Sequence, residues 1–575
     1  KKLYWFFKLE KWPYITGILA LSLVSLLNLL PPRLIGEVID QIASKDLTNL
    51  ELAYQLFVLV LSALAMYALR FVWRKYILGT ANRLGRILRY RLFEHFTRMS
   101  PSFYQTYRTG DLMAHATNDI NAVVGVAGGG VMSAVDASIT ALVTVLTMFF
   151  VLDWRLTLIA ILPLPFMAWG TSLIGRKNHE SFKAAQEAFS DLNNKVQESV
   201  SGIKVTKSFG YQDAETAAFA RINQDVFKKN ILAAKYNALF DPMVLIFVGL
   251  SYLLTLIFGG LFISQGQLTV GELVTFITYL DMLVWPLQAM GYLFNISQRG
   301  TVSYERIESL LAQESDVIEV ASPIKDIKNG RLDYSIQEFA YDDRPTLRDL
   351  HFSIEQGQTL GIVGVTGSGK TTLLRLLLRE QDIQDGNICL AGHDIRDYSL
   401  SAFRSLIGYV PQDQILFATS IRDNIRFGNP SLSDQDVIAV TKLCGIYEDI
   451  MQMPDGFDTL VGERGVSLSG GQKQRLAMCR ALILNPDILI LDDSLSAVDA
   501  KTEHLILDNL KRERSGKTTL ITAHRLSAVV HADLILVLDQ GRVIESGSHQ
   551  ELLTQDGWYA NTYQNQQLAE SLEEV

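Results

Sequence analysis

Six long apolar segments occupy the first half of the chain, and they set the strongest limit on its fold. They lie at roughly 14–38, 51–78, 122–152, 156–176, 240–263 and 271–298. A helix of about 20 apolar residues crosses the hydrocarbon core of a bilayer. Within lipid a helix also satisfies its own backbone hydrogen bonds. The sequence therefore predicts an all-α membrane domain with six spanning helices.

Two local features modify the first of these segments. Pro31 and Pro32 lie inside it and predict a kink, because proline has no N–H to continue the helical ladder. Such a kink is tolerated where neighbouring helices or water satisfy the freed carbonyl groups. Before the segment, Lys1–Trp12 mixes aromatic and basic residues and predicts a helix lying in the membrane interface.

Lys and Arg residues gather in two of the connections, 79–121 and 177–239. The other turns hold only Lys45 and Arg155, and 264–270 holds neither residue type. Positive charge near spanning segments marks the cytoplasmic side, so both termini are predicted to be cytoplasmic. Helical periodicity continues into the basic connections and breaks at Ser100-Pro101 and near Gly210. Those two tips are the natural contacts for a cytoplasmic motor.

The overall composition excludes some classes of partner and chemistry. The chain has 52 Lys and Arg against 61 Asp and Glu, a net charge of −9. This balance disfavours nucleic acid as a partner, which would favour a basic surface. Its three cysteines are Cys389, Cys444 and Cys479, and their spacing matches neither a metal site nor a disulfide framework.

The pattern changes near residue 300, and this change predicts the domain organisation. We assign 1–298 to the membrane domain and 299–329 to a linker. From 330 to 575, short β-rich runs alternate with helical stretches, which indicates an α/β P-loop ATPase domain. The acidic tail from Gln564 is predicted to be a surface helix or a frayed end.

A glycine-rich loop follows the apolar run that ends at Val363. Gly364–Thr371 matches the pattern G-x-x-x-x-G-K-[ST], whose backbone N–H groups cradle phosphate. Lys370 is predicted to reach the β- and γ-phosphates, and Thr371 to bind Mg²⁺. The candidate nucleotide-binding residues here are Gly364, Thr366, Gly367, Ser368, Gly369, Lys370, Thr371 and Thr372.

A second apolar run, Ile488–Leu491, ends in two carboxylates, Asp492 and Asp493. Asp492 is positioned at a strand end to bind Mg²⁺ directly or through water. Asp493 is the candidate for orienting or deprotonating an attacking water. A general base must come within about 2.6–3.2 Å of its proton, directly or through one water. Aspartate is shorter than glutamate by one methylene, about 1.5 Å of reach.

These motifs, together with Leu468–Gln472 between them, resemble those of ABC exporter half-transporters along the whole chain. The resemblance implies a type IV exporter fold, with ATP and Mg²⁺ as cofactors. It identifies Leu468–Gln472 as the signature, which contacts the γ-phosphate held by the opposite subunit. The residues that it adds to the nucleotide site are Ser469, Gly470, Gly471 and Gln472, Asp499 in the D-loop, and Tyr341 stacking on adenine.

The same resemblance implies four further roles. Gln412 couples nucleotide to the membrane helices and contributes to the Mg²⁺ site. His524 is the switch histidine that contacts the γ-phosphate. The candidate catalytic residues are therefore Asp493, His524 and Gln412. Glu463 fits a segment that touches the coupling helices.

The chain departs from the family pattern at Asp493, where the family usually has Glu. It therefore resembles the subunit of heterodimeric bacterial multidrug exporters whose own ATP site is degenerate. This resemblance implies a homologous partner that carries the missing Glu, and a multi-pass location in a bacterial plasma membrane. The site on this chain would bind ATP and hydrolyse it poorly.

Polar groups inside the predicted spans suggest where cargo binds. Asp136 and Asp281 are intramembrane carboxylates, which usually face a bundle interior or a water-filled cavity. With Trp285 they could form a weakly anionic aromatic pocket for lipophilic drugs and dyes, or they could serve only helix–helix hydrogen bonds. Two other functions stay open: a lipid or peptide exporter of the same architecture, and a nucleotide-gated membrane module that does not transport.

Overall fold

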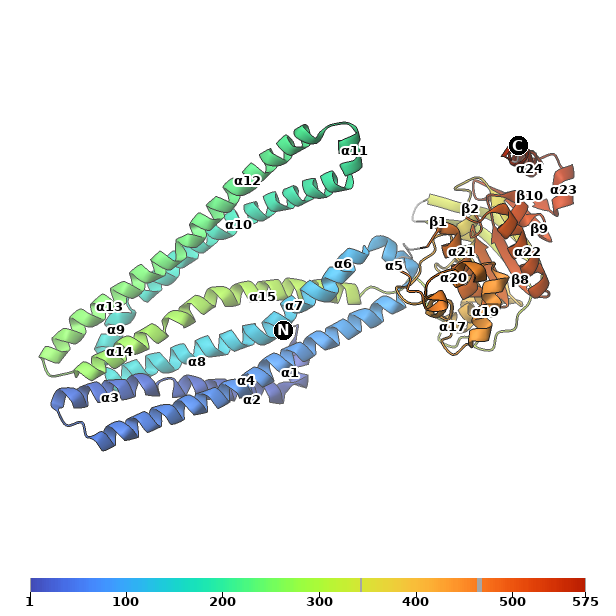
Figure 1. Ribbon diagram of the computed structural model, residues 1–575. Coiled ribbons are helices and arrows are strands. Elements are labelled where there is room, and N and C mark those ends of the chain that lie inside the picture. Colours follow the sequence, from blue (N-terminus) through green and yellow to red (C-terminus); the bar gives the residue numbers. More distant parts are fainter. Residues whose placement is uncertain (1, 342–343, 463–467, 574–575) are drawn as a thin grey trace. The chain divides into compact units, whose positions relative to one another are not determined.

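The computed structural model of the chain describes residues 2–341, 344–462 and 468–573 (Figure 1). It divides into two compact units. The first contains Lys1–Thr97 and Gly110–Gln313, and the second contains Arg98–Thr109 and Glu314–Val575.

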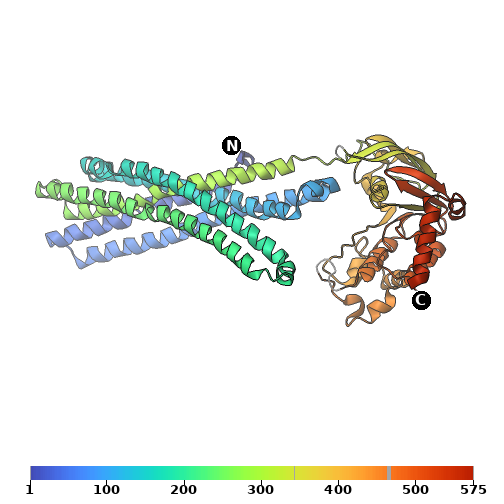
Figure 2. The ribbon, with the colours of Figure 1, turned by 90° about the horizontal axis from the view of Figure 1, so that it is seen from above.

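The first unit is all helical, and its helices run along a common direction in both views (Figures 1 and 2). In the described part of the chain, six helical segments are long and apolar enough to span a membrane. They are Lys11–Ser44, Asn49–Arg98, Thr109–Leu152, Trp154–Ser201, Gln212–Ser264 and Val270–Leu311. The prediction of six spanning helices is confirmed, and each segment is longer than the apolar run that identified it.

The first spanning segment is interrupted just before its two prolines. Helix α2 (Lys11–Leu27) ends there, and α3 (Leu30–Ser44) starts with Pro31 and Pro32 in its first turn. Proline is tolerated there because the first N–H groups of a helix have no partner within the helix. The α14 helix (Val270–Met282) supplies hydroxyl donors to this stretch: Tyr279 bonds the Leu29 carbonyl at 2.7 Å, and Thr275 bonds that of Pro32 at 3.2 Å. A neighbouring helix thus satisfies carbonyl groups around the kink.

Helices α3 and α14 also cross at close range through two glycines. A Cβ atom on Gly271 would lie 2.0 Å from the Gly36 carbonyl oxygen, so a side chain cannot fit there. The Asp40 carboxylate accepts hydrogen bonds from the Gly271 N–H at 2.7 Å and the Thr269 hydroxyl at 2.6 Å. It therefore caps the N-terminus of α14 and fastens the two helices together.

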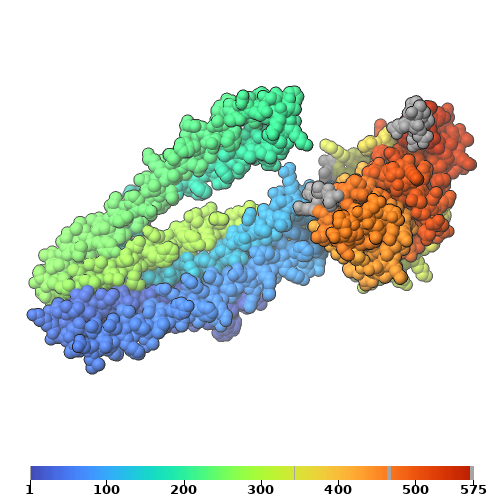
Figure 3. All heavy atoms as spheres, in the orientation of Figure 1, coloured from blue at the N-terminus to red at the C-terminus, as the bar shows by residue number. Residues whose placement is uncertain are grey.

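Several helices continue well beyond a bilayer's thickness, as the periodicity predicted. Helix α4 (Asn49–Arg98) has 50 residues, and its chain turns at Ser100 into α5 (Pro101–Thr106). Helices α10 (Leu164–Ser201) and α12 (Gln212–Ala238) run side by side and form one packed arm (Figures 1 and 3). They are joined by α11 (Ile203–Ser208) and Gly210, whose φ is 63°. Both predicted breaks are confirmed.

The remaining helices complete the membrane unit. The third span joins α6 (Thr109–Ala114), α7 (Ile120–Gly125) and α8 (Val131–Thr147) through three π-helical turns, His115–Asp119, Val126–Gly130 and Met148–Leu152. The other helices are α1 (Tyr4–Leu9), α9 (Trp154–Ile161), α13 (Phe240–Ser264) and α15 (Val284–Leu311).

Two sets of polar contacts fasten α15 to the start of the chain and to the third span. The Trp5 indole on α1 donates to the Tyr304 hydroxyl at 3.1 Å. The Asp119 carboxylate accepts from Ser303 at 2.7 Å and pairs with Arg306 at 3.0 Å. The α15 helix therefore extends as an ordered element past the apolar run that predicted it.

The second unit contains two sheets within the described residues. An antiparallel sheet has the order β2-β1-β4-β5. A larger sheet has the order β10-β9-β3-β8-β7-β6, parallel from β9 to β6 with β10 antiparallel at its edge. The strands are β1 (Leu332–Tyr341), β2 (Arg344–Ile354), β3 (Thr359–Gly364), β4 (Asp385–Leu390), β5 (His393–Asp394), β6 (Ile407–Val410), β7 (Ile488–Asp492), β8 (Thr518–Thr522), β9 (Leu534–Asp539) and β10 (Arg542–Gly547).

Helices cover the larger sheet and carry the motifs. They are α16 (Lys370–Leu377), α17 (Leu400–Ser405), α18 (Ile421–Ile425), α19 (Asp434–Leu443), α20 (Tyr447–Met451), α21 (Gly470–Leu482), α22 (Ala500–Glu513), α23 (His549–Thr554) and α24 (Trp558–Glu573). The predicted α/β P-loop fold is confirmed. The three cysteines are free thiols, and two of them, Cys444 and Cys479, are buried.

The register of the parallel strands brings the motifs to one edge. Asp492 at the end of β7 pairs with Thr522 at the end of β8, and β3 ends beside them at Gly364. Ligands of open parallel sheets bind at the carboxyl ends of the strands. The fold therefore places the glycine-rich loop, the two carboxylates and the end of β8 together.

Candidate active site

The loop between β3 and α16 depends on glycine for its backbone conformation. Gly364, Gly367 and Gly369 have φ angles of 143°, 84° and 103°, which side chains disfavour. A Cβ atom on Gly364 would also lie 2.1 Å from the Leu538 carbonyl oxygen on β9. The loop therefore turns tightly over the sheet before it enters α16.

The same loop carries the features that an anionic phosphate requires. The Ser368 hydroxyl is buried and has no hydrogen-bond partner among the described residues. No atom lies within 4 Å of the Cβ position of Gly367, so its backbone is open to a ligand. The Lys370 ammonium group is held at 2.8 Å by the Gly364 carbonyl and at 3.0 Å by that of Val365. Burial lowers the pKa of Lys370, while Asp493 and Asp492 oppose that shift. The site fits the phosphate chain of ATP.

Asp492 is the carboxylate best placed for a metal ion. It is buried, and its Oδ1 atom accepts from the Thr371 hydroxyl at 3.0 Å and the Thr522 hydroxyl at 2.7 Å. The Tyr409 hydroxyl donates to Oδ2 at 3.3 Å. Among the described residues, no group of three or more His, Cys, Asp or Glu side chains could hold a metal. This donor set suits Mg²⁺, which binds through one or two carboxylates together with substrate phosphates and water.

Asp493 is fixed in an unusual backbone conformation. Its φ is 46°, which is uncommon for a residue other than glycine. Its N–H bonds the Thr522 carbonyl at 3.1 Å and the Thr522 hydroxyl at 3.0 Å, and the Ser496 hydroxyl donates to its carbonyl at 3.0 Å. The Gln412 amide lies 3.4 Å from the Asp493 carboxylate. Burial raises the pKa of Asp493, while His524 opposes that shift.

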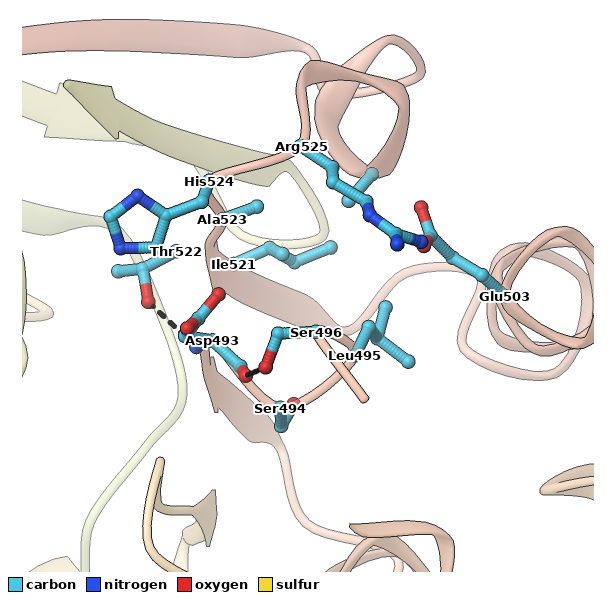
Figure 4. A pocket seen from close by; sticks show the side chains of 11 residues that line it. Asp493, Ser494, Leu495, Ser496, Glu503, Ile521, Thr522, Ala523, His524 and Arg525 are labelled. Carbon is cyan, nitrogen blue, oxygen red and sulfur yellow. Dashed lines mark hydrogen bonds and ion pairs between the residues drawn. The ribbon is translucent and has the colours of Figure 1, made fainter. Parts of the chain in front are cut away.

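A small hollow of about 30 Å³ lies beside Asp493 and is lined by Ser496, His524 and Arg525 (Figure 4). The Glu503 carboxylate forms its far wall and is only 2% exposed. Glu503 accepts from Ser527 at 2.9 Å and pairs with Arg525 at 3.5 Å, and Arg525 also donates to the Val498 carbonyl at 3.4 Å. These bonds connect the segment after His524 to the D-loop.

The signature residues form the N-terminus of α21. The Ser469 hydroxyl accepts from the Gln472 N–H at 3.3 Å, and the Gln472 side chain accepts from the Ser469 N–H at 3.0 Å. This reciprocal cap leaves Gly470 and Gly471 at the first helical positions. A Cβ atom on Gly471 would lie 2.8 Å from the Ala497 carbonyl oxygen, so the signature packs against the D-loop.

The structure also places four other predicted site residues. Asp499 caps α22 by accepting from the Thr502 N–H at 2.9 Å, and this bond lowers the pKa of Asp499. Tyr341 lines a separate hollow with Arg375 and Glu380, and α5 forms its opposite wall. Thr366 is exposed and Thr372 is buried at the loop. Glu463 lies outside the described residues.

The three predicted cargo-site residues, Asp136, Asp281 and Trp285, do not all lie together in the structure. The Asp136 carboxyl group interacts with the Trp285 and Thr140 side chains and also has an electrostatic interaction with Arg70. Asp281 instead accepts a hydrogen bond from the Tyr252 hydroxyl at 3.1 Å. The structure thus brings Asp136 and Trp285 together and gives Asp281 its own partner.

Three residues at the site were missed by reasoning from sequence: Tyr409, Thr522 and Gln474. The buried Gln474 side chain holds the D-loop, donating to Ser496 at 3.2 Å and accepting from the Ala497 N–H at 3.0 Å. Each lies within three residues of a motif residue, and Tyr409 is a polar position in the otherwise apolar strand β6. Closeness in sequence to a motif residue could therefore have identified these three residues.

Comparison with known proteins agrees with this geometry. Residues 14–287 match the model of the ABC transporter transmembrane region, and residues 347–496 match the ABC transporter model. The chain is 43% identical over 99% of its length to a probable multidrug resistance ABC transporter ATP-binding/permease protein, YheI, of Bacillus subtilis, covering 97% of that protein. The chain belongs to the ABC transporter family.

Two further similarities refine the assignment. This ABC exporter is 40% identical to the multidrug resistance-like ATP-binding protein MdlA of Escherichia coli, over 100% of its own length and 98% of that protein. It superposes on a bacterial Atm1-family ABC exporter solved with ATP bound, with a TM-score of 0.82 and 28% identity over 96% of this chain and 99% of that one. The chain is therefore a membrane exporter with an ATPase domain that binds ATP and couples its hydrolysis to transport.

Proposed function

We propose that this chain is one subunit of a heterodimeric exporter of amphipathic drugs and dyes, with its own ATP site only weakly hydrolytic. The observation that carries the proposal is Asp493, whose carboxylate lies 3.4 Å from the Gln412 amide. By its resemblance to the family, this position usually holds Glu. The rest of the site is complete, including Lys370 and the signature.

The fixed backbone of Asp493 explains why the shorter side chain matters. Two hydrogen bonds from its N–H to Thr522 prevent the main chain from advancing toward a γ-phosphate. The side chain then falls short of a glutamate's reach by about 1.5 Å. A displacement of about 1 Å at a reacting centre can cost about 100-fold in rate. The site therefore binds ATP and leaves most of it uncleaved.

The intact signature is the second support. Ser469, Gly470, Gly471 and Gln472 form an ordered helix N-terminus that suits a phosphate on an opposing subunit. A partner with a glutamate at the position of Asp493 would supply the second site. Hydrolysis at that site would reset the transporter.

We assign the remaining roles as part of the same proposal. Thr371, Gln412 and Asp492 would hold Mg²⁺ beside the nucleotide, and the ion would neutralise charge on the phosphates. His524 and Asp499 face the γ-phosphate region, and Tyr341 stacks on adenine.

The cargo site is proposed inside the membrane unit. The Asp136 carboxyl group with Trp285 offers a negative charge beside an aromatic ring, which suits a lipophilic cation. Asp281 with Tyr252 offers a second such position. The named relatives are described as multidrug resistance proteins or multidrug resistance-like proteins, which favours drugs as cargo.

Orientation and domain limits complete the proposal. The distribution of Lys and Arg supports cytoplasmic termini. We place the membrane domain at 1–298, the linker at 299–329 and the ATP-binding domain at 330–575.

The test is ATP turnover by the transporter purified together with its partner. Asp493→Asn should leave turnover nearly unchanged, whereas the equivalent change of the partner's glutamate should abolish it. Asp493→Glu should increase turnover by adding a second active site. Loss of all turnover in Asp493→Asn, or full activity of this chain as a homodimer, would contradict the proposal.

Cargo is tested separately by reconstituted transport. ATP-dependent accumulation of a cationic dye, reduced by Asp136→Asn, is the expected result. Accumulation of a labelled lipid or peptide instead would identify one of the alternative exporters. Ion conductance without accumulation would identify a nucleotide-gated module.

A further inference from the structure

Gln566 on the last helix, α24, holds the backbone of the segment that carries His524. Its amide nitrogen donates to the His524 carbonyl oxygen at 2.9 Å, and its amide oxygen accepts from the Leu526 N–H at 2.8 Å. These two partners fix the orientation of the amide, because a carbonyl only accepts and an N–H only donates. One side chain therefore bonds the main chain on both sides of Arg525.

The two bonds come where the sheet no longer supports the chain. After β8, the Ala523 N–H bonds the Ile362 carbonyl at 3.3 Å. The chain then enters a 3-10 turn, Leu526–Val529, and the first N–H groups of such a turn have no partner within it. Gln566 supplies the missing acceptor. His524 thus lies between the sheet and the turn, and its position depends on side chains from other elements.

Asp493 and Glu503 hold the same segment from the side of the site. The His524 N–H donates a hydrogen bond to the Asp493 carboxyl group. The Arg525 side chain extends away from the His524 ring toward Glu503, with which it pairs at 3.5 Å (Figure 4). The His524 backbone therefore bonds a site residue through its N–H group and Gln566 through its carbonyl group. Removing the amide of Gln566 would leave only one of these two restraints.

The helix that carries Gln566 is anchored to the ATPase unit. The Tyr559 side chain is fully buried, and its hydroxyl group bonds His549 at 2.8 Å. The Glu545 carboxylate accepts from the Tyr559 N–H at 3.2 Å. Tyr559, Tyr563 and Gln566 are spaced four and three residues apart, so they share one face of α24. This anchored face holds the Gln566 amide in place.

We propose that Gln566 is a positioning residue for His524, and that α24 thereby sets how well this chain's site distinguishes ATP from ADP. The inference rests on the proposed contact of His524 with the γ-phosphate, which ADP lacks. With the Gln566 amide in place, the imidazole is held where the γ-phosphate binds. Without it, ATP loses that contact, and the binding of ADP does not change. Gln566 acts through His524 and not through a contact of its own with nucleotide.

The test measures nucleotide binding to this chain in the whole transporter, in its native assembly. The chain is crosslinked on ice with photoreactive ATP while unlabelled ATP or ADP competes for the site. Gln566→Met keeps the length of the side chain and removes both hydrogen bonds. It should weaken competition by ATP about threefold to tenfold, the effect expected from about one lost hydrogen bond, and leave competition by ADP unchanged. A variant that only destabilised the unit would weaken competition by both nucleotides.

A second variant isolates the bond to His524. Gln566→Glu keeps an acceptor for the Leu526 N–H and removes the donor to the His524 carbonyl oxygen. It should therefore weaken competition by ATP as Gln566→Met does. The matched controls are Asn565→Leu and Asn565→Asp, at an exposed position of the same helix, and both should leave the ATP and ADP affinities unchanged.

His524→Ala distinguishes this inference from the proposed function. It should weaken competition by ATP at least as much as Gln566→Met, again without affecting ADP. If His524→Ala leaves competition by ATP unchanged, the proposed γ-phosphate contact and this inference both fail. If His524→Ala weakens it while Gln566→Met or Gln566→Glu does not, this inference alone is overturned. Equal weakening of ATP and ADP in Gln566→Met would also overturn it, because Gln566 would then serve only the stability of the unit.

Discussion

Thr522→Val tests whether the Thr522 hydroxyl positions the Asp492 carboxylate, which we propose binds Mg²⁺. Valine keeps the β-branched shape that strand β8 favours and removes only the hydroxyl group. That hydroxyl donates to Asp492 at 2.7 Å and accepts from the Asp493 N–H at 3.0 Å. The Asp493 N–H retains the Thr522 carbonyl at 3.1 Å, so the main loss is the bond to Asp492.

A hydrogen bond to a charged group contributes about 1.5–3 kcal/mol to stability. For a domain of this size, each kcal/mol shifts the melting temperature by about 2–4 °C, so the expected fall is about 3–12 °C. The Asp492 carboxylate then keeps Thr371 and Tyr409 as its remaining donors. If the less well positioned carboxylate weakens the binding free energy of Mg²⁺ by about 0.7–1.4 kcal/mol, the Mg²⁺ concentration for half-maximal ATPase activity rises about three- to tenfold.

The assay is differential scanning fluorimetry of the purified transporter together with an Mg²⁺ titration of its ATPase activity. Thr519→Val on the same strand is the matched control, since its hydroxyl accepts from Arg514 at 3.3 Å and does not contact Asp492. The control should lower the melting temperature without changing the Mg²⁺ requirement. Equal Mg²⁺ requirements for Thr522→Val and Thr519→Val would refute the positioning role.

Three further outcomes are expected. Burial raises the pKa of Asp493 in the folded domain, so the protonated carboxyl group is the form that the fold favours. The stability that this group contributes is present at low pH and is lost as the pH rises through its pKa. Asp493→Asn should therefore stabilise the domain at pH 7, and unfolding curves measured at acid pH should show a smaller stabilisation. Gln474→Leu removes both bonds to the D-loop and should reduce ATPase activity several-fold with little change in ATP affinity, whereas Gln452→Leu, at an exposed glutamine of the same unit, should leave turnover unchanged. Gly271→Ala places a methyl group 2.0 Å from the Gly36 carbonyl oxygen and should lower the thermal stability of the membrane unit, while Gly249→Ala, which meets no atom within 4 Å, should not.

The parts of the fold that could be predicted are those governed by local physics. Lipid requires long apolar helices, so the spans were evident from their length alone. The breaks at Ser100 and Gly210 followed from proline and glycine chemistry. The glycine-rich loop and the carboxylates after β7 could be recognised because phosphate and metal binding restrict which residues fit.

Other features depend on contacts between distant parts of the chain. The crossing of Gly36 with Gly271 joins the first and last spans, and nothing in either local sequence indicates the partner. Thr522 reaches Asp492 through the register of β7 and β8, which periodicity does not determine. The hydrogen bond between Asp281 and Tyr252 was not predicted either, because it joins two helices whose packing the sequence does not reveal.

The most direct test of the proposed degenerate site is the fate of ATP bound at this chain's Lys370 during turnover. The transporter assembled with its partner is supplied with photoreactive ATP carrying a label at either the α- or the γ-phosphate, and is crosslinked at steady state. Our account predicts that this chain retains both labels, because its nucleotide stays uncleaved, while the partner retains mainly the α-label. Retention of the α-label alone on this chain would show that Asp493 supports hydrolysis and would contradict the account.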